Sequence, residues 1–560
     1  MRVVLRRTNR RTDRRWIAGV GLLVTVACNG TVPVGNTGLS GGTESEPDSG
    51  GPDDSATGAD TGAVDTTGPG VAGTTGGETT GEADTESTKL DLPEIPDPPA
   101  PDFPQTCAEA EDAQSSVGCT FYPIYLPFVA NGLVGFAAAN VSNEVAHVEL
   151  FDHTGIVDSV DVDPGDVHIF ERDTSLRATY GNTEIGNAGY EMVSDHPLQV
   201  FAFMPYSTTL VTNDASIIYP ASALGTRHRI ANFENVGPDI PSQHVTVVAT
   251  EDATEVTFSL VNAGAITTAG GTIPALDYDA GQDTVTVTLD RLEHLVIAAQ
   301  EWVDDGPNPF YGSLLESDAP VAVYSGVGGL LLNAGANDLV QTAVPPTSVF
   351  GTEYAAAKFI PVGNAPDIWR FVGNVDGTTI QLTGGVSDTI QLDAGEVYDL
   401  WTSASFWAAG NEAFGLLHVM TGATANPPLI PHDCDMAISG PGDPAIGWAF
   451  AQENWLHRYL MPVGQGSLEK GADEWCHNHL TVVAPLDRWE EIEVNGEVLP
   501  APFDIGNEDF GYTYVPAPAG IHELVAPEGV GVQVDVYGFH HNGSYFYPGG
   551  MGLKDINPEG

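Results

Sequence analysis

The strongest constraint on the fold is a block of two short strands around an acidic turn, which recurs four times along the chain. In each block Val, Thr, Ile and Phe alternate with polar residues, and Asn, Asp or Gly separates the two alternating stretches. Alternation with a period of two is typical of strands that bury one face, and the separating residues favour turns. The four blocks cover residues 135–152, 244–260, 368–384 and 479–496.

Other segments recur in the same order after these blocks. They are a second strand pair (DTVTVTLDRLEHLVI), a turn followed by a strand (SDAPVAVYSG) and a connecting segment (TAVPPTSVFGTEY), at intervals of roughly 100–127 residues. No long amphipathic helical pattern accompanies them. We therefore predict an all-β head over residues 103–560, built from about four imperfect repeats of β-sandwich-like units. A closed ring of four β units is the alternative, because periodicity does not determine how the units are arranged.

The segment before the head has the composition of a disordered linker. Residues 29–102 contain no aromatic residue, 15 acidic residues and one basic residue, Lys89. Such a segment cannot bury enough apolar area to offset the chain entropy that folding removes. We predict that residues 28–102 form an acidic Gly/Thr/Ser/Pro-rich tether, which becomes stiffer where proline is frequent near its end.

Residues 1–27 have the features of a signal peptide. Residues 1–15 carry seven arginines, and the apolar run WIAGVGLLVTVA that follows has 12 residues, too short to span a membrane. Small Ala27 precedes Cys28, an arrangement that resembles the lipobox of bacterial lipoproteins, although Thr25 stands where that motif prefers leucine. The resemblance implies lipidation of Cys28 and anchoring in a bilayer. A plain secretory signal that leaves Cys28 as a free thiol is the alternative.

The charge of the chain excludes one class of partner. The sequence has 76 acidic and 19 basic residues and a formal net charge of −57. A chain this acidic repels phosphate backbones, so we expect no nucleic-acid partner. By charge alone it is also a poor binder of anionic lipid surfaces, so we expect membrane contact through the lipid anchor only.

The four remaining cysteines are Cys107, Cys119, Cys434 and Cys476. An even set in an exported chain favours disulfides, and three pairings are open. We favour Cys107–Cys119 together with Cys434–Cys476, because the first pair is close in sequence.

A zinc site is the alternative use of the second cysteine pair. PHDCD and WCHNH place His432, His477 and His479 beside Cys434 and Cys476. Cysteine and histidine are the usual ligands of structural zinc, but Cys-x-x-Cys spacing is absent. We therefore predict no metal at these residues.

The chain shows no familiar catalytic motif. His-Glu-x-x-His and a phosphate-binding loop are absent from the sequence, and Gly-x-Ser-x-Gly is absent from the predicted head, residues 103–560. The Gly-rich YSGVGG (324–329) is expected to be a tight turn. DVDPGD holds Asp161, Asp163 and Asp166 without the spacing of an EF-hand, so calcium is an alternative to our expectation of no cofactor.

Aromatic residues gather at the end of the last repeat. His540 and His541 precede Tyr545, Phe546 and Tyr547. Such a group can form a platform for a glycan or peptide, but packing at the end of a strand is the interpretation we favour. We therefore assign no binding residue and no catalytic residue from the sequence.

Several segments, taken in order, resemble the IgGFc-binding protein N-terminal domain family. They are SSVGCTFYPIYL, GFAAANVSN, VTVVATEDATEVTF, LLESDAPVAVYSG and QTAVPPTSVFGTEY, in which Phe350 stands where the family has an aromatic residue. The similarity spans most of residues 103–548. Members of this family are found in animal mucus proteins and as predicted surface lipoproteins of myxobacteria. The resemblance implies an extracellular binding or adhesion module, not that this chain binds antibody, and it carries over no binding residues.

Together these features predict an exported, lipid-anchored protein of the outer membrane or cell surface that is not an enzyme. Its expected partner is an extracellular glycan or protein. Two other functions stay open. A secreted carbohydrate-active hydrolase would need two convergent carboxylates in a groove, and a passive coat component would contact only itself.

Overall fold

The computed structural model describes most of the predicted head. The described residues are 103–125, 133–172, 183–204, 214–233, 243–261, 277–279, 284–298, 310–330, 332, 338–360, 366–421, 442–464, 477–540 and 543–557. Residues 1–102, with the predicted signal peptide, Cys28 and the predicted linker, lie outside this set. Within it, no helix is long and apolar enough to cross a membrane.

The described chain is almost entirely antiparallel β-structure in four successive units, as the repeated blocks predicted. The first unit comprises α1 (Cys107–Ala113), β1 (Val117–Phe121), β2 (Val134–Asn140), β3 (Ala146–Asp152), β4 (Gly155–Val162), β5 (Val167–Arg172), β6 (Glu184–Gly186), β7 (Glu191–Met204) and β8 (Asp214–Ile218). The second comprises β9 (Arg227–Ala231), β10 (Gln243–Ala249), β11 (Thr254–Ser259), β12 (Asp277–Asp279), β13 (Thr284–Leu289), β14 (His294–Ala298), β15 (Tyr311–Ser317), β16 (Val321–Leu330) and β17 (Asp338–Ala343).

The third and fourth units repeat this order. The third comprises β18 (Gly351–Ala356), β19 (Asp367–Gly373), β20 (Thr378–Gly384), β21 (Asp388–Leu392), β22 (Val397–Thr402), β23 (Phe406–Met420) and β24 (Ala445–Ala449). The fourth comprises β25 (Arg458–Val463), β26 (His477–Pro485), β27 (Glu493–Val494), β28 (Glu497–Val498), β29 (Phe503–Asp504), β30 (Phe510–Pro516), β31 (Gly520–Val525), β32 (Gln533–His540) and β33 (Gly543–Pro548). Short 3₁₀ helices η1 (Ala221–Ala223), η3 (Thr347–Val349) and η4 (Gln452–Asn454) join the units, and η6 (Leu486–Glu491) follows β26.

Each unit has two β layers with corresponding strand orders. In the second unit the layers are separate sheets, β17-β16-β10-β14-β6 and β12-β13-β11-β15-β9. In the first and third units one long strand, β7 or β23, pairs with members of both layers, so all seven strands form one sheet. The predicted class of β-sandwich-like repeats is thus confirmed. β6 comes from the first unit but pairs with β14 of the second, which joins the two units.

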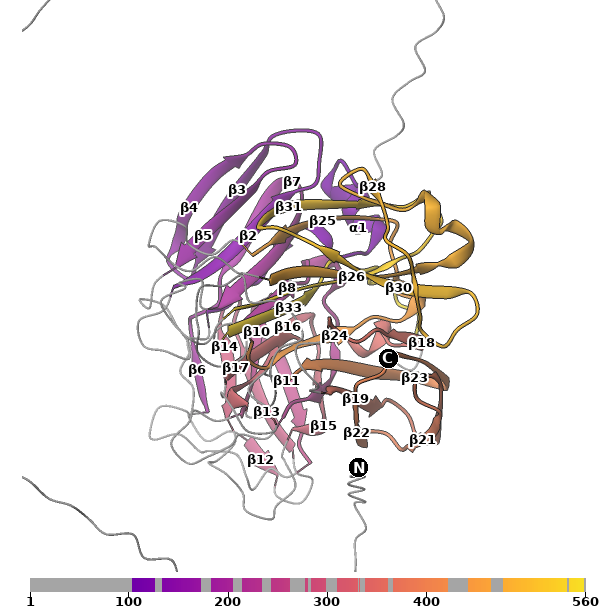
Figure 1. Cartoon of the computed structure of the whole chain (residues 1–560). Helices are drawn as coiled ribbons and strands as arrows, with labels where there is room; N and C mark the ends of the chain where they lie inside the picture. Colours follow the sequence, from indigo (N-terminus) through magenta and orange to yellow (C-terminus); the bar gives the residue numbers. More distant parts are fainter. Residues whose placement is uncertain are drawn as a thin grey trace, which may run out of the picture. The chain divides into compact units, whose positions relative to one another are not determined.

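The four units form a closed ring, the arrangement that the sequence analysis gave as the alternative. The last strand of each unit contacts the last strand of the next, in the order β8, β17, β24, β33, and β33 contacts β8 again. Figure 1 shows the units around these strands. One hydrophobic core cluster runs through all four units; it includes Phe136, Val247, Val419 and Val482.

The buried carboxyl group of Asp214, on β8, joins the last strands of the four units. It accepts backbone N–H bonds from Gln341 on β17 (3.0 Å) and Ile446 on β24 (3.5 Å). It also accepts the backbone N–H of Phe546 on β33, so each of the other three last strands donates to the same side chain. Burial raises the pKa of Asp214 well above its ordinary value, and these N–H bonds oppose the rise.

The connecting segments recur because the joints between units repeat one close contact. A Cβ atom on Gly225 would lie 2.3 Å from Cβ of Pro346, and one on Gly351 would lie 2.3 Å from Cβ of Ala451. Such distances are far below van der Waals contact, so only glycine fits at either joint. The glycine in each TAVPPTSVFGTEY-like segment therefore lets the next connecting segment pack against it.

Three local predictions from the sequence were wrong. YSGVGG is not a tight turn but part of β16, where Gly326 leaves room for the His244 ring, since a Cβ there would lie 2.7 Å from its Nε2. In the block 479–496, the 3₁₀ helix η6 and the two-residue β27 replace a full second strand. Helix α1 was not predicted, although Thr106 and Glu109 form the capping box that marks its start.

The ring closes where α1 and β1 meet the end of the chain. Ser116 donates its backbone N–H to the carbonyl of Met551 (2.8 Å), and the Gln199 side chain donates to the carbonyl of Gly549 (2.9 Å). Beside this junction Cys107 and Cys119 form a disulfide, the local pairing that the sequence favoured.

Removing this disulfide is expected to lower the free energy of unfolding. The bond closes a loop with a sequence separation of 12 residues, for which loop entropy gives about 3 kcal/mol. The double variant Cys107→Ala/Cys119→Ala should therefore lose about that amount in chemical denaturation under oxidising conditions. Addition of a reductant should weaken the parent protein more than the variant, which keeps only the predicted Cys434–Cys476 pair. An equal midpoint for the two proteins would contradict a stabilising role.

Candidate functional site

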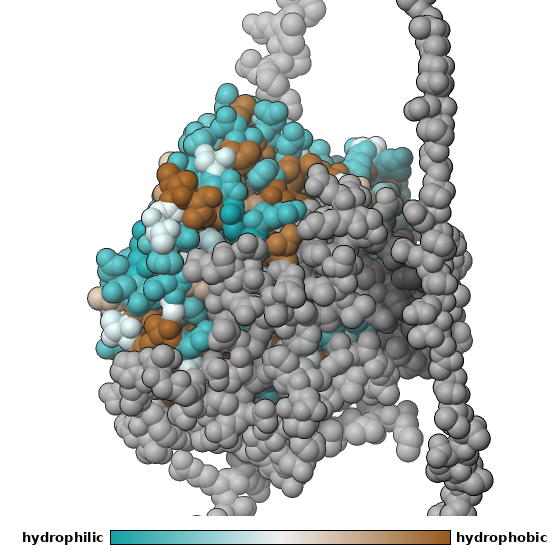
Figure 2. Space-filling view, turned by 90° about the vertical axis from the view of Figure 1, so that its left-hand side faces the viewer, coloured by the Kyte–Doolittle hydropathy of each residue, from teal (hydrophilic) through white to brown (hydrophobic). Residues whose placement is uncertain are grey.

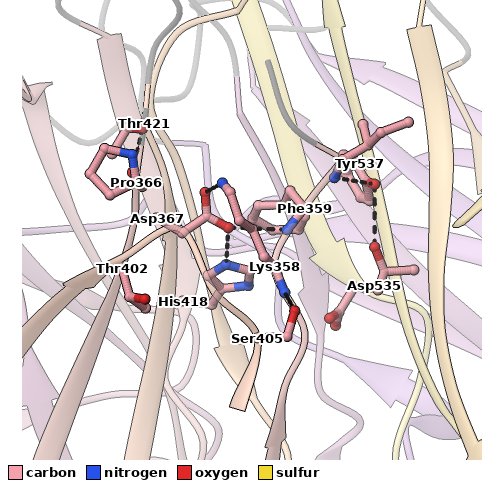
Figure 3. Close-up of polar contacts among 12 residues, drawn as sticks. Lys358, Phe359, Pro366, Asp367, Thr402, Ser405, His418, Thr421, Asp535 and Tyr537 are labelled. Carbon is pink, nitrogen blue, oxygen red and sulfur yellow. Dashed lines mark hydrogen bonds and ion pairs between the residues drawn. The ribbon is translucent and has the colours of Figure 1, made fainter. Parts of the chain in front are cut away.

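The most prominent polar cluster in the head lies on the third unit, at its contact with the fourth (Figure 3). The Lys358 ammonium lies 2.7 Å from one oxygen of Asp367, and His418 Nε2 lies 3.0 Å from the other. The His418 ring is stacked between Trp369 and Phe359, with centroid distances of 3.7 and 3.9 Å.

Electrostatics in this cluster favour a fixed ion pair. Burial alone would raise the pKa of Asp367, but the charge of Lys358 and the hydrogen bond from His418 outweigh burial and hold the pKa below its ordinary value. Burial lowers the pKa of His418 despite the nearby carboxylate. We infer an ionised Asp367 paired with Lys358 and a neutral His418.

The cluster joins two units and is closed to ligands. The side chains of Lys358, Asp367 and His418 are 8%, 4% and 1% exposed. Two tyrosines of the fourth unit hold the same segment. Tyr514 donates its hydroxyl to the Lys358 carbonyl (2.9 Å), and Tyr537 accepts the backbone N–H of Ile360 (3.0 Å). Because a macromolecule cannot reach these groups, we assign the cluster to the junction between units and not to binding.

An open pocket on the fourth unit is the better candidate for a functional site. It has a volume of about 480 Å³. Its lining comes from η4 and the residue after it, the start of η6, the start of β30 and the turn before β32; these residues are Gln452, Trp455, Pro485, Asp487, Arg488, Phe510, Gly529, Val530 and Gly531. Pockets that bind small molecules or side chains have volumes of this order and combine apolar walls with a few polar groups.

Two aromatic rings shape the wall of this pocket. Trp455 and Phe510 are partly exposed and meet edge to face, with centroids 5.5 Å apart and an interplanar angle of 87°. Behind them, buried Trp407 of the third unit stacks on Phe510 with a centroid distance of 5.0 Å. The pair is therefore held rigidly, and rigid aromatic residues are the commonest anchors in protein interfaces.

The polar groups of the pocket differ in how far they are already hydrogen-bonded within the protein. The Trp455 indole N–H donates to the carbonyl of Phe450 (3.3 Å), which leaves the ring faces for a ligand. Arg488 donates two hydrogen bonds to Glu491, at 2.6 and 2.8 Å, so its charge is neutralised within η6. Asp487 is the one carboxylate among the lining residues.

The outer face of the first unit is a weaker candidate. The side of the head that carries β3 to β5 is mostly hydrophilic, with hydrophobic residues in separate groups (Figure 2). Val145 and Ile156 are the exposed large hydrophobic residues of this unit among those the structure describes. Single exposed apolar residues are normal on a soluble surface and indicate no binding site.

The comparisons with known proteins support one family. The family model described as IgGFc binding protein matches residues 214–538, which is more than half of the chain. The chain belongs to the IgGFc-binding protein family. The match covers the last strand of the first unit, all of the second and third, and most of the fourth, including every residue that lines the pocket.

Other comparisons with this family member are uninformative. No curated protein matches it. Among solved structures, a crystal structure of two B repeat units of the collagen-binding protein of Staphylococcus aureus has 9% identity to it. The alignment covers 72% of this chain and 93% of that one, with a TM-score of 0.08, and carries no argument about fold or function.

Among the residues that the structure describes, those proposed as alternatives from the sequence do not gather into a site. His477 and His479 lie on one face of β26, and both rings pack on Phe539. Burial lowers the pKa of His479 to about 4. The other members of the zinc alternative, and the predicted pairing of two of them, lie outside the described residues; they are His432, Cys434 and Cys476.

The calcium alternative also gains no support from the arrangement of its carboxylates. Asp161 lies 2.7 Å from Nδ1 of His147 on the neighbouring strand β3, while Asp166 donates its backbone N–H to the carbonyl of Asp163. In the parts of the head that the structure describes, no group of three or more His, Cys, Asp or Glu side chains could hold a metal ion.

The aromatic residues at the end of the last repeat are packing residues, as the favoured interpretation had it. Tyr545, Phe546 and Tyr547 of β33 are buried, and Phe546 packs against Phe359 and His418 of the third unit. His541 lies outside the described residues, and the structure describes only the backbone of His540. In this family member Phe546 therefore belongs to the contact between the third and fourth units, whereas Tyr545 and Tyr547 pack against Phe201 and Phe203 of the first unit.

Sequence reasoning missed the pocket residues of this family member. Trp455 lies in the connecting segment GWAFAQENWLHRY, and Asp487 and Arg488 lie in a stretch predicted as a turn between two strands. The available signal was a tryptophan and a phenylalanine beside polar residues at the ends of predicted strands. That signal is weak, because the two rings are 55 positions apart in the chain.

Proposed function

We propose that this IgGFc-binding family member is a lipid-anchored binding and adhesion protein of the cell surface. Its ligand is an extracellular protein or glycan, and the pocket on the fourth unit is the contact site. The observation that carries the proposal is the rigid, partly exposed pair Trp455 and Phe510 in a pocket lined from four chain segments. Membership of a family described as a binding protein supports the same class of function.

The anchoring part of the proposal rests on the sequence. The basic leader, the apolar run and the cysteine at position 28 support export and lipidation, and the acidic linker would hold the head away from the bilayer. A hydrolase on the same scaffold is less well supported at this pocket. Glycoside hydrolysis uses a pair of carboxyl groups, whereas Asp487 is the single carboxylate among the lining residues.

The proposal is tested with cells that display the full chain, incubated with arrays of labelled glycans and extracellular proteins. We expect at least one ligand to bind, and Trp455→Ala to weaken its binding at least tenfold, because the variant removes an anchor ring. Phe510→Leu should act in the same direction while preserving the packing volume. Cys28→Ala should move the binding activity from the cells into the medium.

Trp401→Ala is the matched control. Trp401 is a 40% exposed tryptophan on β22 of the third unit, and it is not among the pocket residues. If binding falls equally in Trp401→Ala and Trp455→Ala, the pocket is not the contact site. The absence of any ligand on either array, with a folded protein on the surface, would overturn the binding function itself.

A further inference from the structure

We propose that the pocket on the fourth unit receives a cationic side chain. This inference rests on the proposed function and specifies its ligand. The ligand is then a basic segment of an extracellular protein, with one lysine or arginine placed against the exposed parts of Trp455 and Phe510. Three properties of the pocket lead to this conclusion, and each concerns a group already described.

The first property is the chemistry of the walls. Trp455 has its N–H occupied by the Phe450 carbonyl, and Phe510 has no polar atom, so both present only π surface to a ligand. The negative face of an aromatic ring attracts an ammonium or guanidinium group, and tryptophan does so most strongly. Two rings at 87° to each other can contact one cation from two directions.

The second property is the local charge. Arg488 is paired with Glu491 and is also attracted by the charge of Asp487, so the three side chains together carry one net negative charge. Exposed Asp509 and Glu528 precede the lining residues Phe510 and Gly529 in the chain. Residues 451–560 contain 17 acidic and four basic residues. The potential at this pocket therefore favours a cation and repels an anionic glycan.

The third property is the shortage of directed hydrogen-bond groups. A pocket for a neutral sugar needs several donors and acceptors aimed at its hydroxyls, because an unpaired hydroxyl is costly to bury. Here the Trp455 indole N–H donates to the Phe450 carbonyl, and Nε and Nη2 of Arg488 donate to Glu491, so fewer donors are left for a sugar. A cation needs only the ring faces and one carboxylate. The chain as a whole, with its net charge of −57, would also steer a basic protein toward itself.

The test compares two probes of equal shape and different charge on the full-length protein. The probes are choline and 3,3-dimethyl-1-butanol, in which a carbon atom replaces the charged nitrogen. Binding is measured by isothermal titration calorimetry. We expect choline to bind at least tenfold more tightly than the alcohol. A short lysine-containing peptide should compete with choline, and the same peptide with norleucine in place of lysine should not.

Variants assign this binding to the pocket. Asp487→Asn keeps the shape of an exposed side chain and is expected to weaken choline binding about fivefold or more, whereas Phe510→Leu should weaken it about tenfold. Glu255→Gln, which removes one exposed charge from β11 of the second unit, is the matched control and should leave binding unchanged. An equal loss in Glu255→Gln would mean diffuse attraction by the acidic surface and would overturn the inference.

The outcomes separate this inference from the proposed function. If the alcohol binds as well as choline, or neither probe binds while an array ligand still depends on Trp455, the inference fails and the binding function stands. In that case the ligand is neutral, such as a glycan. If no probe and no array ligand depends on Trp455, both fail.

Discussion

Replacing Asp214 by alanine is expected to lower the free energy of unfolding by about 3–6 kcal/mol, the largest loss from any single residue that we predict. The carboxylate accepts backbone N–H groups from β17, β24 and β33, and in the alanine variant these donors stay buried without that acceptor. Each buried donor left unpaired costs about 1–3 kcal/mol. The loss should appear in urea denaturation as a lower midpoint with an unchanged slope, if unfolding stays cooperative.

Asp214→Asn separates hydrogen bonding from charge. The asparagine keeps one acceptor oxygen but directs an NH₂ group at backbone donors, so it should be destabilising to a smaller extent than alanine. Ser216→Ala, in the same buried strand, is the control, because it removes one hydroxyl that donates to Ile217 and accepts from Ala343. A loss in Asp214→Ala no larger than the loss in Ser216→Ala would contradict the central role of this carboxylate.

Ionisation of two buried carboxyl groups is also expected to lower the free energy of unfolding as pH rises from 5 to 8. Burial raises the pKa of Asp535 to about 7, against one opposing hydrogen bond from Gln533, and burial raises the pKa of Asp443 to about 7 as well. In the unfolded chain both groups ionise near pH 4. Between about pH 4 and pH 7 these two groups therefore bind more protons in the folded state than in the unfolded state, and their contribution to stability falls as pH rises through this window.

The size of this effect follows from the shift. A rise from 3.8 to about 7 corresponds to about 4 kcal/mol for each group across the window. Repulsion among the many ionised carboxylates of so acidic a chain acts in the same direction. The lowered pKa of Asp367 has the opposite sign, but its contribution is lost only below about pH 4. Buried His228 and His479, whose pKa burial lowers to about 4, act in the opposite direction between about pH 4 and pH 6.5, because they stay neutral in the folded state. The carboxyl effect is therefore measured by comparing the parent protein with a variant that lacks one buried carboxyl group, at pH 5 and at pH 8.

Asp535→Asn identifies one source of the pH dependence. The asparagine keeps an acceptor for Gln533 and removes the ionisable group, so the variant should be more stable than the parent at pH 8 and similar to it at pH 5. Glu497→Gln, which removes an exposed carboxylate from β28 of the same unit, should leave the difference between the two pH values almost unchanged. If Asp535→Asn gains no more stability over the parent at pH 8 than at pH 5, the explanation by buried carboxyl groups is wrong.

Most strands could be predicted because the alternation of apolar and polar residues along a strand reflects which of its faces is buried. The alternation in residues 244–260 and 368–384 predicts β10, β11, β19 and β20. It is clearest in β11 and β20, because one face of each of these two strands is exposed. Where both faces are buried the pattern disappears. β16 is buried along its whole length, and its glycines resemble a turn because the sequence does not show that β17 and the His244 ring lie against them.

The candidate site was harder to predict than the strands. Trp455 and Phe510 form one wall only because the connecting segment before β25 and the start of β30 meet in the folded unit. The disulfide between Cys107 and Cys119 could be predicted because its partners are close along the chain. Proximity in sequence is visible without a structure, whereas proximity across four segments is not.

The sequence by itself determined the β character of the head, its fourfold repetition and its extreme acidity, because these depend on local alternation, spacing and composition. Only the tertiary structure decided that the four units close into a ring, that Asp214 binds three neighbouring strands and that an aromatic pocket opens on the fourth unit. The physical reason is that a strand encodes which of its faces is buried but not which surface buries it. The identity of that surface depends on contacts between residues separated by a hundred positions or more.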